Sequence, residues 1–565
     1  MKTEKHIIYQ TFPRLFGNFT EYPVKNGSKE ENGCGKFNSY TVKALTGIKE
    51  LGVTHIWYTG ILAHSTCTDY TAYGIPKDHH AIVKGKAGSP FAIKDYYDVD
   101  PDLAEHIPDR MNEFRALVQR THDAGLKVII DFVPNHVSRN YCSLSKPVYM
   151  DDLGQHDQTG LTFLPSNNFY YLPGQHLELR FGAQEEDFEY NEFPAKVTGN
   201  DCFTAHPGVD DWYETIKLNY GVDYLNGRAQ HFTPIPDTWH KMLHILLFWL
   251  ESDVDGFRCD MAEMVPVQFW NWVIPRVKKQ KEVLFIAETY DPSHYREYLQ
   301  MGHFDYLYDK VGTYDLLRNI LCGNSSTQGL LAQLQMNKDI NDQLLFFIEN
   351  HDEQRIASGF FAGDAQAGIP AMIFFGTCHN NPVLLYNGQE LGEKGMDNEG
   401  FSGSDGKTSI FDYWRMDSIR RWANNGRFDG GLLTQEQQLL RTSYQKILRL
   451  AKEEKAFSAG SFYDLAYCNY DNPYFPSDRM LAYLRKHDNE LILVCINFDN
   501  QAYNVRLKIP EKAFEVMQIP DNTVSVTKDL LSGDESICAL TYTCPFHCTA
   551  PGLSAKILKF NFSLL

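Results

Sequence analysis

One short stretch, residues 254–260, limits most strongly what this chain can fold into. It reads Val-Asp-Gly-Phe-Arg-Cys-Asp, which is the pattern of a short buried strand that carries charges a protein core would not normally accept. Side chains alternate between the two faces of a strand, so Arg258 and Asp260 share one face and lie side by side. This pair is either a buried structural salt bridge or part of a functional site, and the rest of the chain has to decide between the two.

Strand and helix patterns alternate along much of the chain, which favours a parallel α/β sheet or barrel. Segments with strand character lie at 6–10, 54–58, 127–133, 254–260, 283–287, 303–308, 344–348 and 383–386. Apolar residues at helical spacing mark segments between them, among them 42–51, 112–124 and 237–250. Another helix begins at Pro266, and Pro275 should end or kink it. Eight strand patterns separated by helices predict a (β/α)₈ TIM barrel.

Two regions do not follow this alternation. Residues 138–232 have no regular period and are rich in Tyr, Phe, Asn, Pro and Gly, and a stretch of that length is too long for a simple loop. After residue 480 the chain reads as strands joined by turns, with little helical periodicity. We therefore predict a barrel formed by residues 1–136 and 233–455, a subdomain at 137–232 inserted after strand three, and a C-terminal antiparallel β-sandwich at 456–565.

The composition limits which partners the protein is expected to bind and in which cellular compartment it is expected to occur. The formal net charge of -19 repels phosphate backbones and anionic membrane surfaces, so we expect neither nucleic acid nor membrane as a partner. The longest strongly apolar run, at about residues 245–250, is far shorter than a membrane span. The N-terminal residues lack the apolar segment of a secretory signal, and the 12 cysteines have no framework spacing. These features favour a cytoplasmic protein with reduced thiols.

Charged and histidine side chains recur where the predicted barrel strands end. They are Asp131 and His136 at and after strand three, Arg258 and Asp260 in strand four, Glu288 after strand five, and His351 and Asp352 after strand seven. The carboxyl ends of barrel strands form the catalytic face of such folds. Packing alone does not explain this arrangement, because crowded charges must be desolvated and repel one another.

Cleavage of a glycosidic bond needs this set of groups. One carboxylic acid protonates the leaving oxygen, and one carboxylate attacks or stabilises the oxocarbenium-like centre. A neighbouring arginine keeps the attacking carboxylate ionised. Binding of a hard divalent cation by the carboxylates is the alternative, but Arg258 beside Asp260 argues against it because the two cations would repel each other.

Four segments of the sequence, in this order, resemble the four motifs of the alpha-amylase family of glycoside hydrolases. They read Asp-Phe-Val-Pro-Asn-His at 131–136, Gly-Phe-Arg-Cys-Asp at 256–260, Phe-Ile-Ala-Glu-Thr at 285–289 and Phe-Ile-Glu-Asn-His-Asp at 347–352. Residues 9–16 and 386–390 also resemble segments that are typical of the family. The resemblance covers about residues 5–455, and it implies a (β/α)₈ barrel with an inserted domain and a C-terminal β-domain.

The resemblance also implies roles for individual residues. Asp260 would be the nucleophile that forms a covalent glycosyl-enzyme, Glu288 the general acid and then the base, and Asp352 the residue that holds sugar hydroxyls and stabilises the transition state. Five further residues would bind the substrate or support the acids: Arg258, His136, His351, Asp131 and Phe91. Phe91 stands where the family usually has a tyrosine, so it can stack on a sugar face but cannot donate a hydrogen bond.

On this basis we expect a retaining α-glucan hydrolase that cleaves α-1,4-glucosidic bonds of malto-oligosaccharides or of starch- and glycogen-type glucans. The alternatives are a transglycosylase or isomerase with the same covalent chemistry, such as a glucanotransferase or a trehalose-forming enzyme, or a catalytically silent sugar-binding protein. No cofactor is required. A structural calcium ion is a family feature that Glu263 and Met264 argue against, since many relatives have Lys-His there. Asn135, a metal ligand in many relatives, is expected here to form ordinary hydrogen bonds.

Overall fold

The computed structural model describes residues 4–179 and 190–562. Its centre is a parallel sheet of eight strands in the order β15-β14-β13-β12-β5-β2-β1-β16. The strands are β1 (Ile7–Thr11), β2 (His55–Tyr58), β5 (Lys127–Phe132), β12 (Gly256–Cys259), β13 (Leu284–Ala287), β14 (Tyr306–Tyr308), β15 (Leu344–Leu345) and β16 (Val383–Tyr386). Phe346, directly after β15, forms a parallel bridge with Val383 and so joins the two edges of the sheet. The predicted barrel is confirmed.

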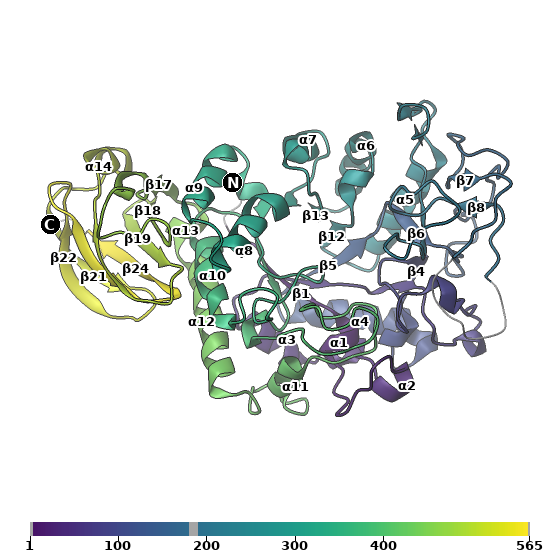
Figure 1. Ribbon diagram of the computed structural model, residues 1–565, viewed down its shortest axis with the longest axis horizontal. Coiled ribbons are helices and arrows are strands. Elements are labelled where there is room, and N and C mark those ends of the chain that lie inside the picture. The colour runs from purple at the N-terminus through teal and green to yellow at the C-terminus, as the bar shows by residue number, and fades with distance from the viewer. Residues whose placement is uncertain (1–3, 180–189, 563–565) are drawn as a thin grey trace.

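Helices surround the barrel in the middle of the molecule (Figure 1). The main ones are α3 (Val42–Lys49), α4 (Arg110–Asp123), α5 (Asp237–Leu250), α6 (Val267–Lys278), α7 (Tyr295–Gln300), α8 (Asp315–Leu321), α9 (Gln328–Met336), α10 (Gly368–Thr377), α11 (Asp417–Ala423) and α12 (Gln435–Glu453). Helix α6 continues through Pro275 to Lys278, so Pro275 does not end it. Ile274 and Val277 on its last turns are buried, and their burial offsets the missing backbone hydrogen bond.

The inserted segment lies between β5 and α5 and has little regular structure. Its strands are β6 (His136–Ser138), β7 (Tyr171–Leu172), β8 (Ala195–Lys196), β9 (Thr215–Lys217), β10 (Val222–Asp223) and β11 (Ala229–Gln230). β6 pairs with β9, which ties the segment to the end of the barrel strand β5. A small apolar cluster around Tyr170, Leu172 and Val197 is separate from the main core. The segment therefore has a core of its own beside the mouth of the barrel.

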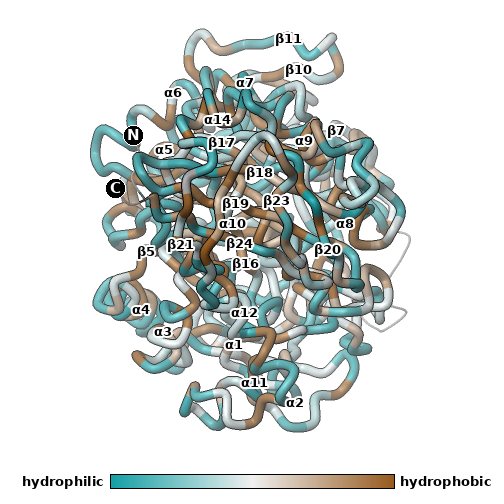
Figure 2. The backbone as a smooth tube through the Cα atoms, turned by 90° about the vertical axis from the view of Figure 1, so that its left-hand side faces the viewer, coloured by the Kyte–Doolittle hydropathy of each residue, from teal (hydrophilic) through white to brown (hydrophobic). Residues whose placement is uncertain are grey.

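The C-terminal region is an antiparallel β-domain, as predicted. It contains β17 (Ser461–Asp464), β18 (Met480–His487), β19 (Glu490–Asn497), β20 (Tyr503–Leu507), α14 (Glu511–Met517), β21 (Thr523–Asp529), β22 (Glu535–Leu540), β23 (Phe546–Ala550) and β24 (Ser554–Asn561). Six of the strands form one sheet, and β20 pairs with β23 in a second. Figure 2 looks onto this region, where hydrophobic residues follow the central strand β19. Four strands, β17 and β21 to β23, and helix α14 were not predicted from the sequence.

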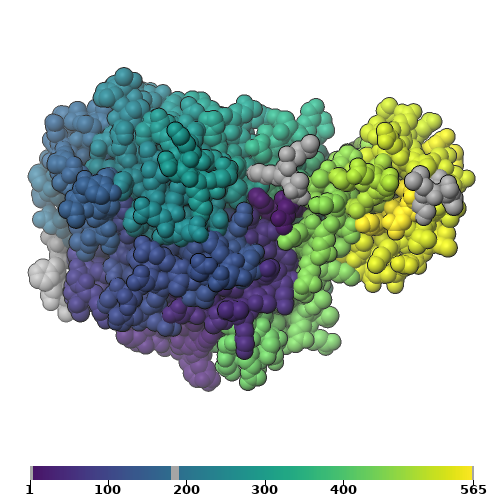
Figure 3. Space-filling view, turned by 180° about the vertical axis from the view of Figure 1, so that it is seen from behind, coloured from purple at the N-terminus to yellow at the C-terminus, as the bar shows by residue number. Residues whose placement is uncertain are grey.

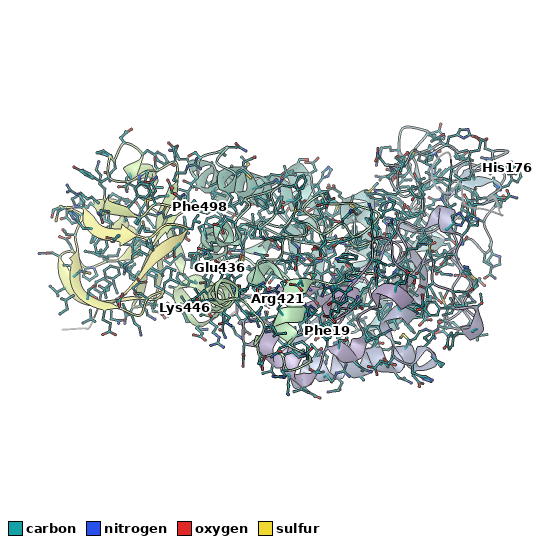
Figure 4. The ribbon with its side chains drawn as sticks, turned by 60° about the horizontal axis from the view of Figure 1, so that its bottom comes forward. Phe19, His176, Arg421, Glu436, Lys446 and Phe498 are labelled. Atoms are coloured by element: carbon teal, nitrogen blue, oxygen red, sulfur yellow. The ribbon has the colours of Figure 1, made fainter. Side chains whose placement is uncertain are left out.

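The C-terminal domain forms a separate lobe at one end of the molecule (Figure 3). It docks through α10 and α12: Arg485 of β18 donates to the carbonyl of Thr377 at the end of α10, and Lys446 of α12 donates to the carbonyl of Leu531. His176 of the inserted segment and Phe498, just after β19, lie toward opposite ends of the molecule (Figure 4). The C-terminal lobe and the inserted segment are thus on opposite sides of the barrel. The precise domain boundaries stay predictions.

The barrel register brings the predicted site residues to one level. Arg258 of β12 lies opposite Asp131 of β5 on one side and opposite Ile286 of β13 on the other. The ladder continues past the strand ends, because the Asp260 N–H donates to the Phe132 carbonyl (2.9 Å) and the Glu288 N–H donates to the Cys259 carbonyl (3.1 Å). Backbone pairing alone therefore places Asp131, Arg258, Asp260 and Glu288 next to one another. Among the described residues, no helix is long and apolar enough to span a membrane.

Candidate active site

Arg258 is the centre of the acid cluster. Its side chain is fully buried, and Nη1 lies 2.6 Å from Asp260 Oδ1 while Nη2 forms an ion pair with Glu288 Oε2 at 2.8 Å. Asp131 Oδ1 is farther away, at 3.7 Å from Nη1. A buried guanidinium needs such partners, because an unpaired charge in the core costs several kcal/mol. One cation thus holds two carboxylates, from the ends of β12 and β13, at the same small volume.

Aromatic rings fix the position of this guanidinium. The centroids of the Trp57, Phe91 and Tyr308 rings lie 5.2, 5.5 and 5.5 Å from the guanidinium carbon. These distances are within the range of cation–π attraction. Nε of Arg258 also donates to the Tyr308 hydroxyl oxygen at 3.3 Å. The guanidinium therefore has little freedom to move away from the two acids.

Asp131 supports Arg258 from the side of the barrel. Its carboxylate accepts hydrogen bonds from Trp57 Nε1 (3.1 Å) and from the Gly60 N–H (2.9 Å). Burial raises the pKa of Asp131 to about 6, while Arg258 and these donors oppose the rise. Asp131 is not among the residues that line the nearby cavity. Asp131 therefore lies behind Arg258, where its carboxylate can support the guanidinium.

Asp260 and Glu288 have different surroundings. Burial raises the pKa of Asp260, and the Arg258 guanidinium opposes that rise. Glu288 accepts hydrogen bonds at both oxygens: from the Met261 N–H at Oε2 (2.7 Å) and from the Tyr290 hydroxyl at Oε1 (2.6 Å). Asp260 faces the cavity, and one of its oxygens pairs with Arg258. Both oxygens of Glu288 accept a hydrogen bond, and Oε2 also pairs with Arg258. Two carboxyl groups so placed can divide the roles of nucleophile and acid.

Asp352 and His351 form the opposite wall. His351 Nδ1 lies 2.8 Å from the Gln10 amide nitrogen, which can only donate, so we assign the hydrogen of the ring to Nε2. Nε2 is 3.1 Å from Asp352 Oδ2. Burial lowers the pKa of His351 to about 3, and Arg258 adds to this effect. Burial also raises the pKa of Asp352, although 39% of its side chain is exposed. His351 is therefore a neutral donor beside a carboxylate that is open to the cavity.

His136 lies at the junction of the barrel with the inserted segment. Its ring centroid is 5.2 Å from that of Trp212, and Nδ1 is 3.2 Å from the Asn135 amide nitrogen. Burial lowers the pKa of His136 to about 3, with further lowering by the positive charges of Lys217 and Lys84. His136 is thus also a neutral imidazole at neutral pH. It can exchange hydrogen bonds with a sugar hydroxyl without adding a charge.

These groups surround a cavity of about 340 Å³. Its lining consists of Lys84, Ser89, Phe91, His136, Trp212, Glu214, Thr215, Asp260, Met261, Glu288, Tyr290, His351, Asp352, Ile410 and Phe411. Two larger hollows, of about 560 and 530 Å³, contain none of the predicted acids. A cavity of this volume that combines flat rings with convergent polar groups suits a sugar residue.

All eight predicted site residues meet here. Six of them line the cavity, and Arg258 and Asp131 lie directly behind it. Three aromatic residues of the site were not predicted from the sequence: Trp57 and Tyr308, which lie within predicted strands, and Tyr290, which follows Glu288 by two residues. Lys84, Trp212 and Glu214 were not predicted either, because they come from irregular segments and carry no pattern that would have revealed them.

Asn135 and Glu263, at the positions where the family resemblance implied a calcium site, have other partners in this structure. The Glu263 carboxylate accepts hydrogen bonds from the backbone N–H groups of Tyr290 (3.0 Å) and Asp291 (3.1 Å), so it shapes the loop that carries Tyr290. The Asn135 oxygen accepts a hydrogen bond from the Lys217 ammonium at 2.7 Å. A divalent ion on that oxygen would meet a positive charge, so the residues present do not fit a calcium ion there.

Comparison with known proteins finds related sequences and structures. A family model described as the alpha-amylase catalytic domain matches residues 22–456. Alpha-amylase MalA of Haloarcula japonica is 23% identical over 89% of this chain, and the match covers 57% of that relative's length. Alpha-amylase 3 of Dictyoglomus thermophilum is 23% identical over 90% of this chain and 87% of its own. The solved structure of the maltogenic alpha-amylase AmyB from Thermotoga neapolitana aligns over 99% of both chains, with a TM-score of 0.63 and 21% identity.

Proposed function

The chain belongs to the alpha-amylase family of glycoside hydrolases, and on this premise we propose that it hydrolyses α-1,4-glucosidic bonds with retention of configuration. The substrates are malto-oligosaccharides or starch- and glycogen-type glucans. One observation carries this proposal: Asp260 and Glu288, from neighbouring strands, share the Arg258 guanidinium at the wall of one cavity. Retaining enzymes need carboxyl groups only about 5 to 5.5 Å apart, and sharing one guanidinium supports such a short separation.

In the first step Asp260 is the nucleophile. Its carboxylate attacks the anomeric carbon, a C–O bond to Asp260 forms, and the glycosidic C–O bond breaks while Glu288 gives its proton to the leaving oxygen. Oε2 of Glu288 is held by Arg258 and the Met261 N–H, so the proton is carried by Oε1. The Tyr290 hydroxyl at 2.6 Å then accepts from Oε1 or turns away as the leaving oxygen arrives.

In the second step water replaces Asp260. Glu288, now a carboxylate, takes a proton from the water, whose oxygen attacks the anomeric carbon and releases Asp260. Arg258 stabilises the Asp260 carboxylate as it leaves, because the guanidinium is already in place at 2.6 Å. The two inversions at the anomeric carbon together give net retention.

Three other residues hold the sugar in the cleavage position. Asp352 is open to the cavity and accepts hydrogen bonds from sugar hydroxyls, most strongly when positive charge develops on the ring. His351 and His136 are neutral, so they add hydrogen bonds without repelling that charge. Phe91 packs against both His351 and Arg258 and offers its remaining ring surface to the sugar.

A product analysis with maltoheptaose tests the proposal. Proton NMR recorded in the first minutes should show α-anomeric products, glucose or maltose, that mutarotate slowly to the equilibrium mixture. Initial β-anomers would refute retention. Products longer than the substrate would identify the chain as a transglycosylase instead. Absence of any turnover on maltoheptaose, glycogen, trehalose and sucrose would favour a catalytically silent sugar-binding protein.

A further inference from the structure

We propose that the ammonium group of Lys217 is a built-in structural cation, which takes the place of a bound metal ion between the barrel and the inserted segment and positions His136. Lys217 is the last residue of β9, and its backbone lies opposite His136 of β6. The proposal concerns the stability and the cation dependence of the fold. It can therefore be tested even if the proposed reaction is wrong.

The Lys217 side chain is enclosed like a coordinated ion. Only 1% of it is exposed, and Nζ lies 2.7 Å from Asn135 Oδ1 and forms an ion pair with Asp201 Oδ1 at 2.5 Å. The Tyr224 ring lies on another side, with its centroid 5.1 Å from Nζ. These partners come from the end of the barrel strand and from two separate parts of the inserted segment. A single positive charge therefore joins three segments that share no continuous sheet.

The oxygen atoms around Nζ have the character of cation ligands. An amide oxygen and a carboxylate oxygen are the groups that hard cations prefer, and here an ammonium satisfies both. Asn135 is fixed in this orientation because its Nδ2 donates to the Gly199 carbonyl at 2.8 Å. Asn135 thus cannot turn away, and its oxygen stays directed at Lys217. A divalent ion at this point would have to displace the ammonium.

The same contacts position His136. Asn135 precedes His136 in the chain, and Gly199 packs so closely that a β-carbon there would lie 2.8 Å from the β-carbon of His136. The Leu218 N–H, next to Lys217, donates to the Asn135 carbonyl at 2.9 Å. His136 is therefore held between β9 and the Gly199 loop, and Lys217 joins those two elements to the barrel. Lys217 does not line the cavity, so it is a positioning residue.

The test compares wild type with Lys217→Ala in the full chain. Wild type should keep its melting temperature and its kcat/KM after treatment with EDTA and after addition of calcium chloride. Lys217→Ala should melt at a lower temperature and lose about tenfold or more in kcat/KM, because His136 is no longer held in place. Calcium or methylammonium, added at millimolar concentration, should restore part of the melting temperature of this variant by entering the vacated oxygen site.

Two further variants separate this role from simple loss of a buried lysine. Lys241 also joins the inserted segment to a barrel helix, since its Nζ donates to the Asp152 carbonyl (2.8 Å) and to Asn168 Oδ1 (2.9 Å). Lys241→Ala should lower the melting temperature without any response to added cations. In Lys217→Ala/Asp201→Asn, the response to calcium should disappear because the anionic ligand is gone.

Three outcomes would overturn the proposal. They are loss of stability of wild type in EDTA, an unchanged melting temperature for Lys217→Ala, or the same response to cations in the Lys241→Ala control. If Lys217→Ala does not fold, Lys217→Arg and Lys217→Met decide the question. Lys217→Arg keeps the positive charge, so it should keep a stable fold that does not respond to EDTA. Lys217→Met lacks the charge and should be less stable. Equal stability of the two variants would contradict a role for the charge.

Discussion

The barrel and the inserted segment build two halves of one cavity by different means. In the barrel, backbone pairing between β5, β12 and β13 sets where Asp131, Arg258 and Glu288 lie. In the inserted segment the strands have only two or three residues, and side chains bond to the backbone instead. For example, the Asp157 carboxylate accepts hydrogen bonds from the N–H groups of Asn168 (2.8 Å) and Phe169 (3.0 Å).

Because the two regions are built differently, we expect them to have different roles. A ladder of backbone hydrogen bonds fixes every residue of a strand relative to its neighbours, which suits groups that must meet within fractions of an ångström. Side-chain bonds join a few residues at a time, so a change in one of them leaves the register of the barrel strands in place. We therefore expect changes at the barrel face to affect the chemical step, and changes in the inserted segment to affect binding and stability.

The largest effect should follow Asp260→Asn at the barrel face. Without the nucleophile, kcat on malto-oligosaccharides should fall at least about 10⁴-fold. The melting temperature should not fall, because Glu288 still pairs with Arg258 and one buried acid is removed. Steady-state kinetics and a thermal melt measure both quantities.

Asp255 on the opposite face of the same strand region supplies the control. Its carboxylate accepts from the Val128 N–H at 2.8 Å and lies 2.7 Å from His122 Nε2, away from the cavity. Asp255→Asn should lower stability and leave kcat within about threefold of wild type. If the two variants behaved alike, the barrel face would have no special part in the reaction.

The barrel half of the site could be predicted from the sequence, because the alternation of side chains along a strand and the place where each strand ends determine where its residues lie. Arg258 and Asp260 were placed on one face by alternation along the strand, and Glu288 was placed beside them by the rule that strand ends meet at one rim. In the inserted segment Trp212 and Glu214 follow no such rule. Their positions depend on side-chain contacts between distant residues, such as Trp212 with His136, which no local pattern encodes.

Arg258→Met should give the next largest effect, on both activity and stability. It removes the partner of two buried carboxylates, and loss of one member of a buried ion pair costs about 3 to 5 kcal/mol. We expect a lower free energy of unfolding, measured by urea denaturation, and a loss of kcat/KM of about 10²-fold or more. Arg258→Met/Glu288→Gln should recover part of the stability but none of the activity. If Arg258→Met alone were as stable as wild type, Arg258 would not hold the two carboxylates in place.

His136 should make stability depend on pH. Its pKa is about 3 in the fold and about 6.5 when unfolded, so below pH 6.5 only the unfolded chain takes up the proton. The unfolded state then binds more protons, and stability is lost as pH falls from 6.5 toward 3. For one histidine this loss is about 2 kcal/mol between pH 7 and pH 5. His136→Gln should show a correspondingly shallower fall in urea denaturation at the two pH values.

His351 provides the comparison on the barrel side, because burial lowers its pKa to about 3 as well. His351→Gln should reduce the pH dependence of stability by a similar amount. A pH dependence that survives unchanged in both the His136 and the His351 variants would mean that neither imidazole is kept neutral by burial.

The smallest effect should come from the ion pair at the rim of the cavity, between Lys84 and Glu214 of the inserted segment. Their Nζ and Oε2 atoms are 3.1 Å apart, and both side chains line the cavity next to His136. Neither contacts Asp260 or Glu288 in the described hydrogen bonds and ion pairs. Glu214→Gln should therefore raise KM for maltoheptaose by about tenfold while kcat changes by less than about threefold.

A double-mutant cycle decides whether this effect belongs to the pair. Either single variant leaves one buried charge without its partner, whereas Lys84→Met/Glu214→Gln removes both charges, so the double variant should be more stable than the sum of the two single changes predicts. If Glu214→Gln instead lowered kcat as strongly as a change at the barrel face, the inserted segment would take part in the chemical step. The two halves of the cavity would then not be separable in function, and the difference in how they are built would have no counterpart in what they do.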